Sequence, residues 1–383
     1  AGALPSGVRC ITPALLLLRV VPLCFLVDVA EPVRAEPDPR ELSWADFRAP
    51  RTILDGHRAL EHLLPRPTQR QLAALLEPSP LAALRRAAGD DEGEFEPMSG
   101  IWQVPLRTPT LPPATHTNCY VLGVERAVVV DPATYEDAER ARLGRLLDRL
   151  VASGTEPSAV VLTHHHRDHV GSARWVAERH RIPVLAHPVT RDLLEGEVAV
   201  DGLLDDGDEL DLGRDATGEP FRLRCLHTPG HAAGHLVLAD LRRGVRSLVV
   251  GDMVAAVGTI IVDPDEGHMG TYIQQLERLR RSFPDGVLFP AHGPPIAAGH
   301  AKLDGYVAHR LGREAKVLAA LEAHGGPATA SQLLPRAYDD APRGVWPLAE
   351  RACLAHLVKL AEEGRARRRD GPGPAPVYEA VGG

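Results

Sequence analysis

The stretch Thr163–His169, which reads THHHRDH, decides the fold of this chain. It follows the apolar run Ala159–Leu162 and precedes Val170–Ser172, a pattern typical of a buried strand that ends in a loop before a helix. The arrangement H-x-H-x-D-H puts four potential metal ligands on one short loop, which is more than packing requires. A histidine-rich surface loop is the alternative, but it would lack the embedded aspartate and the preceding apolar run. The stretch therefore indicates a metal site.

The spacing within this loop predicts two ions rather than one. If the chain stays extended at His164 and His166, residues two apart point the same way, so both imidazoles can face one ion. Asp168 and His169 are adjacent and lie just before a predicted helix over 173–180. Their side chains can therefore turn toward a second ion close to the first.

Three later segments repeat one design, in which an apolar strand-like run ends in a ligand-type residue beside glycine or proline. These segments are Phe221–His231, Ser247–Asp252 and Val287–Pro295. Glycine lets the backbone approach an ion or a substrate closely, and proline fixes the exit angle of the loop. Ligand candidates at the ends of separate strands can converge on one sheet edge.

Taken in order, these motifs resemble the metallo-β-lactamase fold. Its signature loop, third ligand motif, bridging carboxylate and last ligand are matched by 163–169, Thr228–His231, Gly251–Asp252 and Ala291–Gly293. The resemblance implies an α/β protein of the αββα sandwich type. It also implies one metal held by His164, His166 and His231, a second held by Asp168, His169 and His292, and Asp252 bridging the two.

The resemblance implies a chemistry as well. Two divalent ions roughly 3.5–4 Å apart lower the pKa of a shared water toward neutrality and stabilise the negative charge on the attacked group. We expect zinc, with manganese or iron as alternatives, because imidazole and carboxylate ligands suit all three. Asp168, Asp252 and His231 would be the catalytic residues of a metal-dependent hydrolase in which a bridging hydroxide attacks. Asp131, after the apolar run 127–130, resembles the aspartate that orients a ligand imidazole from behind.

Composition indicates a reduced, cytoplasmic setting. The 383 residues, 44% of them hydrophobic, suffice for two or three domains. The five cysteines suggest no disulfide framework, and Cys119 and Cys225, near the motifs, are expected to be small core residues. A net charge of −8 argues against chain-wide affinity for nucleic acid and leaves a local patch open. Abundant arginine and scarce lysine are typical of the GC-rich genomes of some bacteria.

The N-terminal part resembles a different fold. Residues 11–30 are apolar, but charges and prolines interrupt them, so we expect two strands there rather than a signal peptide or a membrane span. Residues 1–88 resemble pieces of a Nudix domain without the G-x5-E-x7-R-E-U-x-E-E-x-G-U box, which predicts a degenerate α+β segment that is only structural. The acidic residues 89–97 are predicted to be a linker.

The hydrolase domain is predicted to span 98–298. Several polar residues flank its ligand motifs and are candidates for a substrate pocket or, alternatively, for core and loop contacts. These candidates are His116, Asn118, His187, His235 and Tyr272. His165 is expected at the pocket rim or in solvent, because it alternates with the two ligands beside it.

Residues 299–383 change in character to helix. Apolar residues recur over 301–324 with a spacing near 3.6, which predicts an amphipathic helix. The following segments are helical stretches at 329–334 and 347–363, an arginine-rich turn at 364–369 and the strand-like Val377–Tyr378. Helix, helix and basic hairpin form a winged-helix pattern. The hydrolase group called β-lactamase-like protein 2 ends in such a domain, so the chain resembles that group.

Three functions follow from these patterns. The group includes endoribonucleases that act on single-stranded RNA, so the resemblance implies a phosphodiester substrate, with the basic turn as a phosphate contact. The alternative is a small-molecule thioester of the glyoxalase II kind, because glyoxalase II has a similar loop, although its C-terminal domain differs. A third hypothesis is a metal-dependent sensor whose winged helix binds a partner. A homo-oligomer is compatible with each.

Overall fold

The computed structural model describes residues 8–10, 25–27, 94–242, 246–284, 286–370 and 374–381. Two short strands precede the main body, β1 (Val8–Cys10) and β2 (Phe25–Val27), and they pair antiparallel. The expected Nudix-like segment, 1–88, otherwise lies outside the described residues, so it stays a prediction.

The first large sheet has the strand order β3-β4-β5-β6-β7-β8-β9. Its strands are β3 (Phe95–Met98), β4 (Ile101–Arg107), β5 (His116–Gly123), β6 (Arg126–Val130), β7 (Glu156–Val161), β8 (Val184–Ala186) and β9 (Gly202–Leu203). Strands β3 to β6 pair antiparallel and β6 to β9 pair parallel. Parallel neighbours need crossover connections. The helices in these crossovers are α4 (Asp137–Ala152), α5 (Arg167–Val170), α6 (Ala173–His180) and α7 (Pro188–Leu193).

The second large sheet has the order β10-β11-β12-β13-β14. Its strands are β10 (Glu209–Arg214), β11 (Pro220–His227), β12 (Leu236–Asp240), β13 (Ser247–Gly251) and β14 (Val287–Pro290). The first four strands pair antiparallel, whereas β13 and β14 are parallel and are connected through helix α8 (Met269–Ser282).

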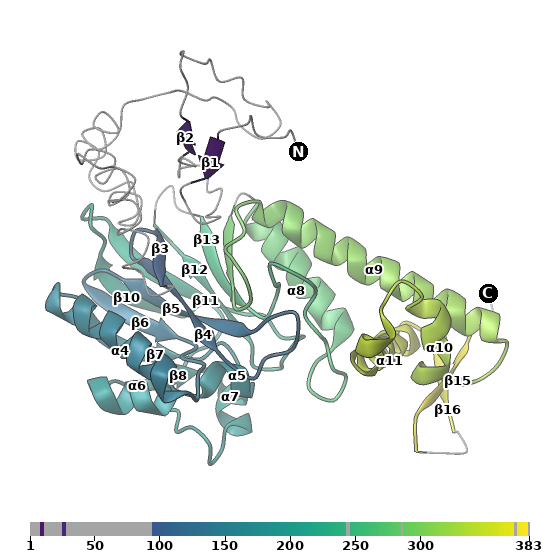
Figure 1. The fold of residues 1–383 in the computed structure, drawn as a ribbon. Coiled ribbons are helices and arrows are strands. Elements are labelled where there is room, and N and C mark those ends of the chain that lie inside the picture. Colours follow the sequence, from purple (N-terminus) through teal and green to yellow (C-terminus); the bar gives the residue numbers. More distant parts are fainter. Residues whose placement is uncertain are drawn as a thin grey trace.

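The two sheets pack face to face between two helical layers (Figure 1). The position of strand β6 between the two layers explains why its residues 127–130 are all apolar. Val129 packs with α4 and α6 in one cluster, while Val128 and Val130 face the other sheet in a second cluster. A strand covered on both faces cannot alternate between apolar and polar residues. A third cluster joins the second sheet to α8, which confirms the predicted αββα sandwich.

The C-terminal part forms a winged-helix domain, as predicted. Its elements are α9 (Gly299–His324), β15 (Ala328–Thr329), α10 (Ala330–Ala337), the 3-10 turn η1 (Arg343–Val345), α11 (Trp346–Glu362), β16 (Ala366–Arg369) and β17 (Val377–Ala380). The three strands form one small sheet in the order β15-β17-β16. Thr329 and Gln332 cap α10 reciprocally, which fixes where this helix begins. The arginine-rich segment 364–369, which was predicted to be a turn, lies largely on strand β16.

Helix α9 belongs to two cores. Leu303 and Tyr306 in its first half pack on the second sheet, whereas Val317 and Leu321 in its second half pack against α10 and α11. The helix is therefore shared by the two parts of the chain. Among the residues that the structure describes, no helix combines the length and the apolarity needed to cross a bilayer.

The predicted acidic linker at 89–97 is wrong at its C-terminal end. Residues 95–98 form β3, which pairs with β4 at the edge of the first sheet. The carboxylates of Glu94 and Glu96 are buried, and each has a partner: Glu94 pairs with Arg149, and Glu96 accepts a hydrogen bond from Gly100 N at 2.8 Å. Carboxylates that have partners can be buried, so the acidic composition of this segment did not mean that it is exposed to solvent.

Candidate metal centre

Seven histidine and aspartate side chains meet beyond the carboxyl ends of strands from both sheets. They are His164, His166, Asp168 and His169 after β7, His231 after β11, Asp252 after β13 and His292 after β14. The structure thus brings together all seven residues that the sequence indicated. Their ligand atoms form three overlapping groups in which the atoms lie within 4.8 Å of one another.

The first group consists of three imidazole rings. His166 Nδ1 lies 2.9 Å from His164 Nε2 and 3.0 Å from His231 Nε2. Burial lowers the pKa of His231 to about 4 and that of His164 well below its usual value, so both rings are neutral at pH 7.

Each of these rings has its other nitrogen next to an oxygen. The pairs are His164 Nδ1 with Thr163 Oγ1 at 2.9 Å, His166 Nε2 with Glu266 Oε2 at 2.9 Å, and His231 Nδ1 with Ile261 O at 2.8 Å. A carbonyl or a carboxylate can only accept, and the Thr163 hydroxyl already donates to Asp131, so the ring nitrogens donate in all three pairs. The three nitrogens that face one another therefore carry lone pairs. A cation satisfies such an arrangement.

The other two groups share His169 and add the carboxylates of Asp252 and Asp168, and they are treated together as the second group. His292 Nε2 lies 3.8 Å from Asp168 Oδ2 and 3.3 Å from Asp252 Oδ1, and the same Asp252 oxygen lies 3.7 Å from His169 Nε2. The other oxygen of Asp252 lies 3.5 Å from His231 Nε2 in the first group. The Asp252 carboxylate therefore stands between the two groups, in the position of a bridge.

Two buried atoms of this group have no hydrogen-bond partner, namely His169 Nε2 and Asp252 Oδ1. Leaving such atoms unsatisfied costs about 1–3 kcal/mol each, more for a charged group, which a bound cation would offset. Burial alone would raise the pKa of Asp252, but His292 and His169 hold it well below its usual value, so the carboxylate stays ionised. These residues fit divalent metal ions, and their imidazole and carboxylate donors suit zinc, manganese or iron.

Asp131 lies behind the ligands, as expected. Its carboxylate accepts hydrogen bonds from Thr163 N at 2.8 Å, Thr163 Oγ1 at 2.6 Å and His169 Nδ1 at 2.8 Å. Its backbone has a φ of 48°, which is unfavourable for a residue other than glycine, asparagine or aspartate. Asp131 thereby directs the free nitrogen of His169 into the site.

Two of the five pocket candidates orient the ligands instead of lining a pocket. His235 is fully buried, and its Nε2 accepts a hydrogen bond from Asp252 N at 3.1 Å. Asn118 Nδ2 donates to Pro290 O at 2.9 Å and to Gly293 O at 2.7 Å, on either side of His292. Both residues fix the backbone that carries a ligand.

His116 acts through its backbone, because its carbonyl accepts a hydrogen bond from His292 Nδ1 at 3.1 Å. Its half-buried side chain contacts Thr115 Oγ1. His165 is half-buried beside His166, with ring centroids 4.7 Å apart, rather than in solvent.

The pocket assignment of Tyr272 and His187 is corrected. Tyr272 is fully buried in the core, and its hydroxyl donates to Met253 O at 2.6 Å. His187 caps α7, where its Nδ1 accepts from Val189 N, and its ring stacks on His227. Its Nε2 then carries the proton, so it is not free to bind a metal with its neighbours.

Sequence reasoning missed Glu266 and the carbonyl of Ile261, which hold His166 and His231. Both lie in the long loop between β13 and α8. The only signal was the acidic, glycine-bearing run 263–268 ahead of a helix, which is equally typical of an ordinary turn.

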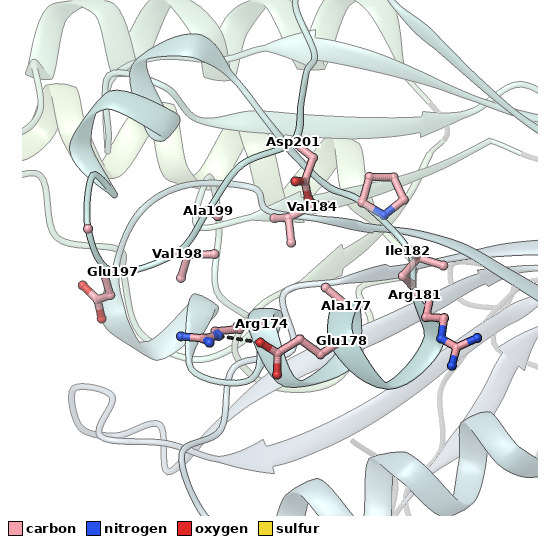
Figure 2. Close-up of a pocket in the computed structure, with 12 residues that line it drawn as sticks. Arg174, Ala177, Glu178, Arg181, Ile182, Val184, Glu197, Val198, Ala199 and Asp201 are labelled. Carbon is pink, nitrogen blue, oxygen red and sulfur yellow. Dashed lines mark hydrogen bonds and ion pairs between the residues drawn. The ribbon is translucent and has the colours of Figure 1, made fainter.

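A surface hollow of about 810 Å³ lies elsewhere, bordered by α6, β8 and the segment 196–201 (Figure 2). Arg174 and Glu178 at its edge pair with each other at 2.7 Å. None of the seven candidate ligands lines it. The hollow is therefore separate from the histidine cluster.

Comparisons with known proteins agree with this geometry. Residues 112–292 match the Metallo-beta-lactamase superfamily, and residues 329–373 match the Beta-lactamase associated winged helix domain. A protein named Beta-lactamase-like protein 2 homolog in Drosophila melanogaster is 30% identical over 261 residues, covering 66% of this chain and 84% of the relative. Its Caenorhabditis elegans namesake is 28% identical over 253 residues, covering 65% and 79%.

Solved structures show the same fold. A metallo-beta-lactamase family protein from Thermus thermophilus superimposes with a TM-score of 0.58 at 26% identity, covering 74% of this chain and 99% of that one. A beta-lactamase domain protein from Burkholderia ambifaria has a TM-score of 0.64 at 22% identity, covering 75% and 93%. The chain belongs to the metallo-beta-lactamase superfamily and carries the winged-helix domain associated with it.

Proposed function

We propose that this chain is a binuclear metal-dependent hydrolase that cleaves a phosphodiester such as single-stranded RNA. Members of its superfamily are generally metal-dependent hydrolases. The observation that carries the proposal is the position of Asp252, whose Oδ1 lies 3.3 Å from His292 Nε2 and whose Oδ2 lies 3.5 Å from His231 Nε2, so that its two oxygens face two separate sets of candidate ligands. When bound, two divalent cations lower the pKa of a water molecule and stabilise the charge that develops on the attacked group.

The residues of the chain have separate tasks in this proposal. One ion would be held by His164, His166 and His231, a second by Asp168, His169 and His292, with Asp252 between them. Their partners, above all Asp131 and His235, keep each donor atom turned inward, so no reorganisation is needed during the reaction.

The choice of a phosphodiester rests on the arginine-rich segment 364–369, which lies largely on β16. Two of its four arginines are engaged, because Arg365 pairs with Glu314 and Arg369 with Glu379. Arg367 and Arg368 are exposed on β16. Exposed guanidinium groups beside a winged helix favour contact with a phosphate backbone.

A parallel activity screen tests the proposal. The purified chain with added Zn²⁺ or Mn²⁺ would be incubated with a single-stranded RNA oligonucleotide, bis-p-nitrophenyl phosphate and a glutathione thioester, with Asp252→Ala as control. We expect cleavage of the phosphodiesters and its loss in the variant. Hydrolysis of the thioester alone would instead favour the glyoxalase II type of activity, and equal rates in the variant would indicate a contaminant.

A further inference from the structure

The loop between β13 and α8, residues 252–268, touches several ligands. Beyond Asp252 itself, it contacts three of them through hydrogen bonds. These are His231 Nδ1 to Ile261 O at 2.8 Å, His166 Nε2 to Glu266 Oε2 at 2.9 Å, and Ala256 N to His292 O at 2.9 Å. The position of this loop therefore decides how both groups of ligands are aimed.

Side chains of the C-terminal helices hold the same loop from the other side. From α9, the Tyr306 hydroxyl accepts from Ala255 N at 2.8 Å, and Arg310 donates to Ile260 O. From α11, Arg351 reaches further along the loop. Each contact comes from a residue more than 45 positions away along the chain. The C-terminal helices are thus built into the support of the metal centre.

Arg351 makes the most specific of these contacts. Its Nε donates to Asp263 Oδ2 at 2.8 Å, and its Nη2 contacts both Asp263 and Asp265. The carbonyl of Asp263 accepts from Gly267 N at 2.7 Å, so the turn closes around Glu266. Exposed single ion pairs contribute little, but a guanidinium that grips two carboxylates fixes geometry as well as charge.

Glu266 is the residue that this turn presents to the site. Its side chain is about half exposed, and its Oε2 accepts a hydrogen bond from His166 Nε2. A flexible carboxylate at the surface would not hold an imidazole in one orientation without support from its backbone. Arg351 supplies that support through the two aspartates that precede Glu266 in the chain.

We propose that Arg351 of the winged-helix domain is a positioning residue of the metal centre. It fixes the turn 263–267, so that the Glu266 carboxylate accepts from His166 Nε2 and leaves His166 Nδ1 free to bind the ion. This inference rests on the proposed function, because it assigns a role toward the same ions. It makes the C-terminal domain a part of the catalytic apparatus in addition to any substrate contact.

The test is the affinity for Zn²⁺ alone, measured by competition with a chromophoric chelator in the full chain. Glu266→Ala should weaken binding about tenfold, as is typical when the partner of a ligand is removed. Arg351→Met should weaken it about threefold to tenfold, and Arg351→Lys should recover part of the loss. The double variant Glu266→Ala with Arg351→Met should bind like Glu266→Ala, because both residues act on His166 in series.

Arg313→Met is the matched control. Arg313 pairs with Asp340 inside the same domain and does not touch the loop. Equal losses in Arg313→Met and Arg351→Met would assign the effect to domain stability and overturn the proposal, as would additive losses in the double variant or unchanged affinity in Arg351→Met. Failure of the wild-type chain to bind Zn²⁺, Mn²⁺ or Fe²⁺ would instead overturn the proposed function.

Discussion

A Cβ atom on Gly230 would lie 2.4 Å from the Cα of Tyr272 and 2.6 Å from its backbone nitrogen. The first turn of α8 therefore packs directly on the backbone of the loop that carries His231. Gly230 also has a φ of 141°, a conformation that side chains with a Cβ rarely adopt. The place of this ligand is set by backbone contact, which explains why glycine precedes it.

Gly230→Ala should therefore destabilise the protein by several kcal/mol, since both the clash and the backbone strain must be relieved. Gly305→Ala is the control, because Gly305 lies in α9 with open space around its Cβ position. That change should stabilise the helix by about 0.5–1 kcal/mol. Urea unfolding measures both variants, and equal midpoints would contradict the packing described here.

Asp131→Asn should weaken Zn²⁺ binding about tenfold with little change in overall fold. Asparagine tolerates the positive φ of this position, but its amide NH₂ can no longer accept from both Thr163 and His169. His169 then loses the partner that keeps its Nε2 free for an ion. Chelator competition would reveal the loss, whereas Asp148→Asn, which removes only a surface pair with Arg179, should bind like the wild type.

The winged-helix domain should lose stability in acid because of His356. This side chain of α11 is fully buried, with Nδ1 4.0 Å from Glu314 Oε2 of α9, and both ring nitrogens lack a hydrogen-bond partner. Burial and the nearby Arg310 and Lys359 lower the pKa of His356 to about 3. The unfolded chain, with a pKa near 6.5, then takes up the proton first as the pH falls.

The free energy of unfolding is thus unaffected by the titration of His356 above about pH 6.5. Below that pH it falls by up to about 1.4 kcal/mol per pH unit toward pH 3. His356→Leu should flatten this part of the stability curve, as followed by urea unfolding between pH 7 and 4. His324→Gln, at an exposed position near the end of α9, should leave the curve unchanged. A parallel shift of both variants would refute the assignment.

The candidate ligands could be predicted because their signal is local. Period-two spacing and adjacency placed His164, His166, Asp168 and His169 on one loop, and strand ends marked the other three. The resemblance to a known fold then supplied their grouping. None of this depended on knowing which loops pack together.

The residues that hold the ligands could not be predicted in the same way. Glu266 and Arg351 come from segments that are polar and unremarkable along the chain, and they act only because α11 packs beside the loop 252–268. For Tyr272 the sequence left a pocket and the core open, and only the packing of α8 places its ring in the core. Strand β3 was missed because acidic residues in and beside it are buried with partners that composition does not reveal: Glu94 pairs with the distant Arg149, and Glu96 accepts from Gly100 N.

Removal of metal should lower the stability of the wild-type chain. The candidate ligands come from four segments that meet only in the folded state, so an ion binds the folded chain far better than the unfolded one. At a free concentration 100 times the Kd, such binding stabilises by about 2.7 kcal/mol. Thermal unfolding with and without EDTA should show this difference in the wild type and a much smaller one in Asp252→Ala. A chelator that leaves the wild-type transition unchanged would mean that the seven side chains hold no ion under those conditions, and the lone pairs facing one another would then need another explanation.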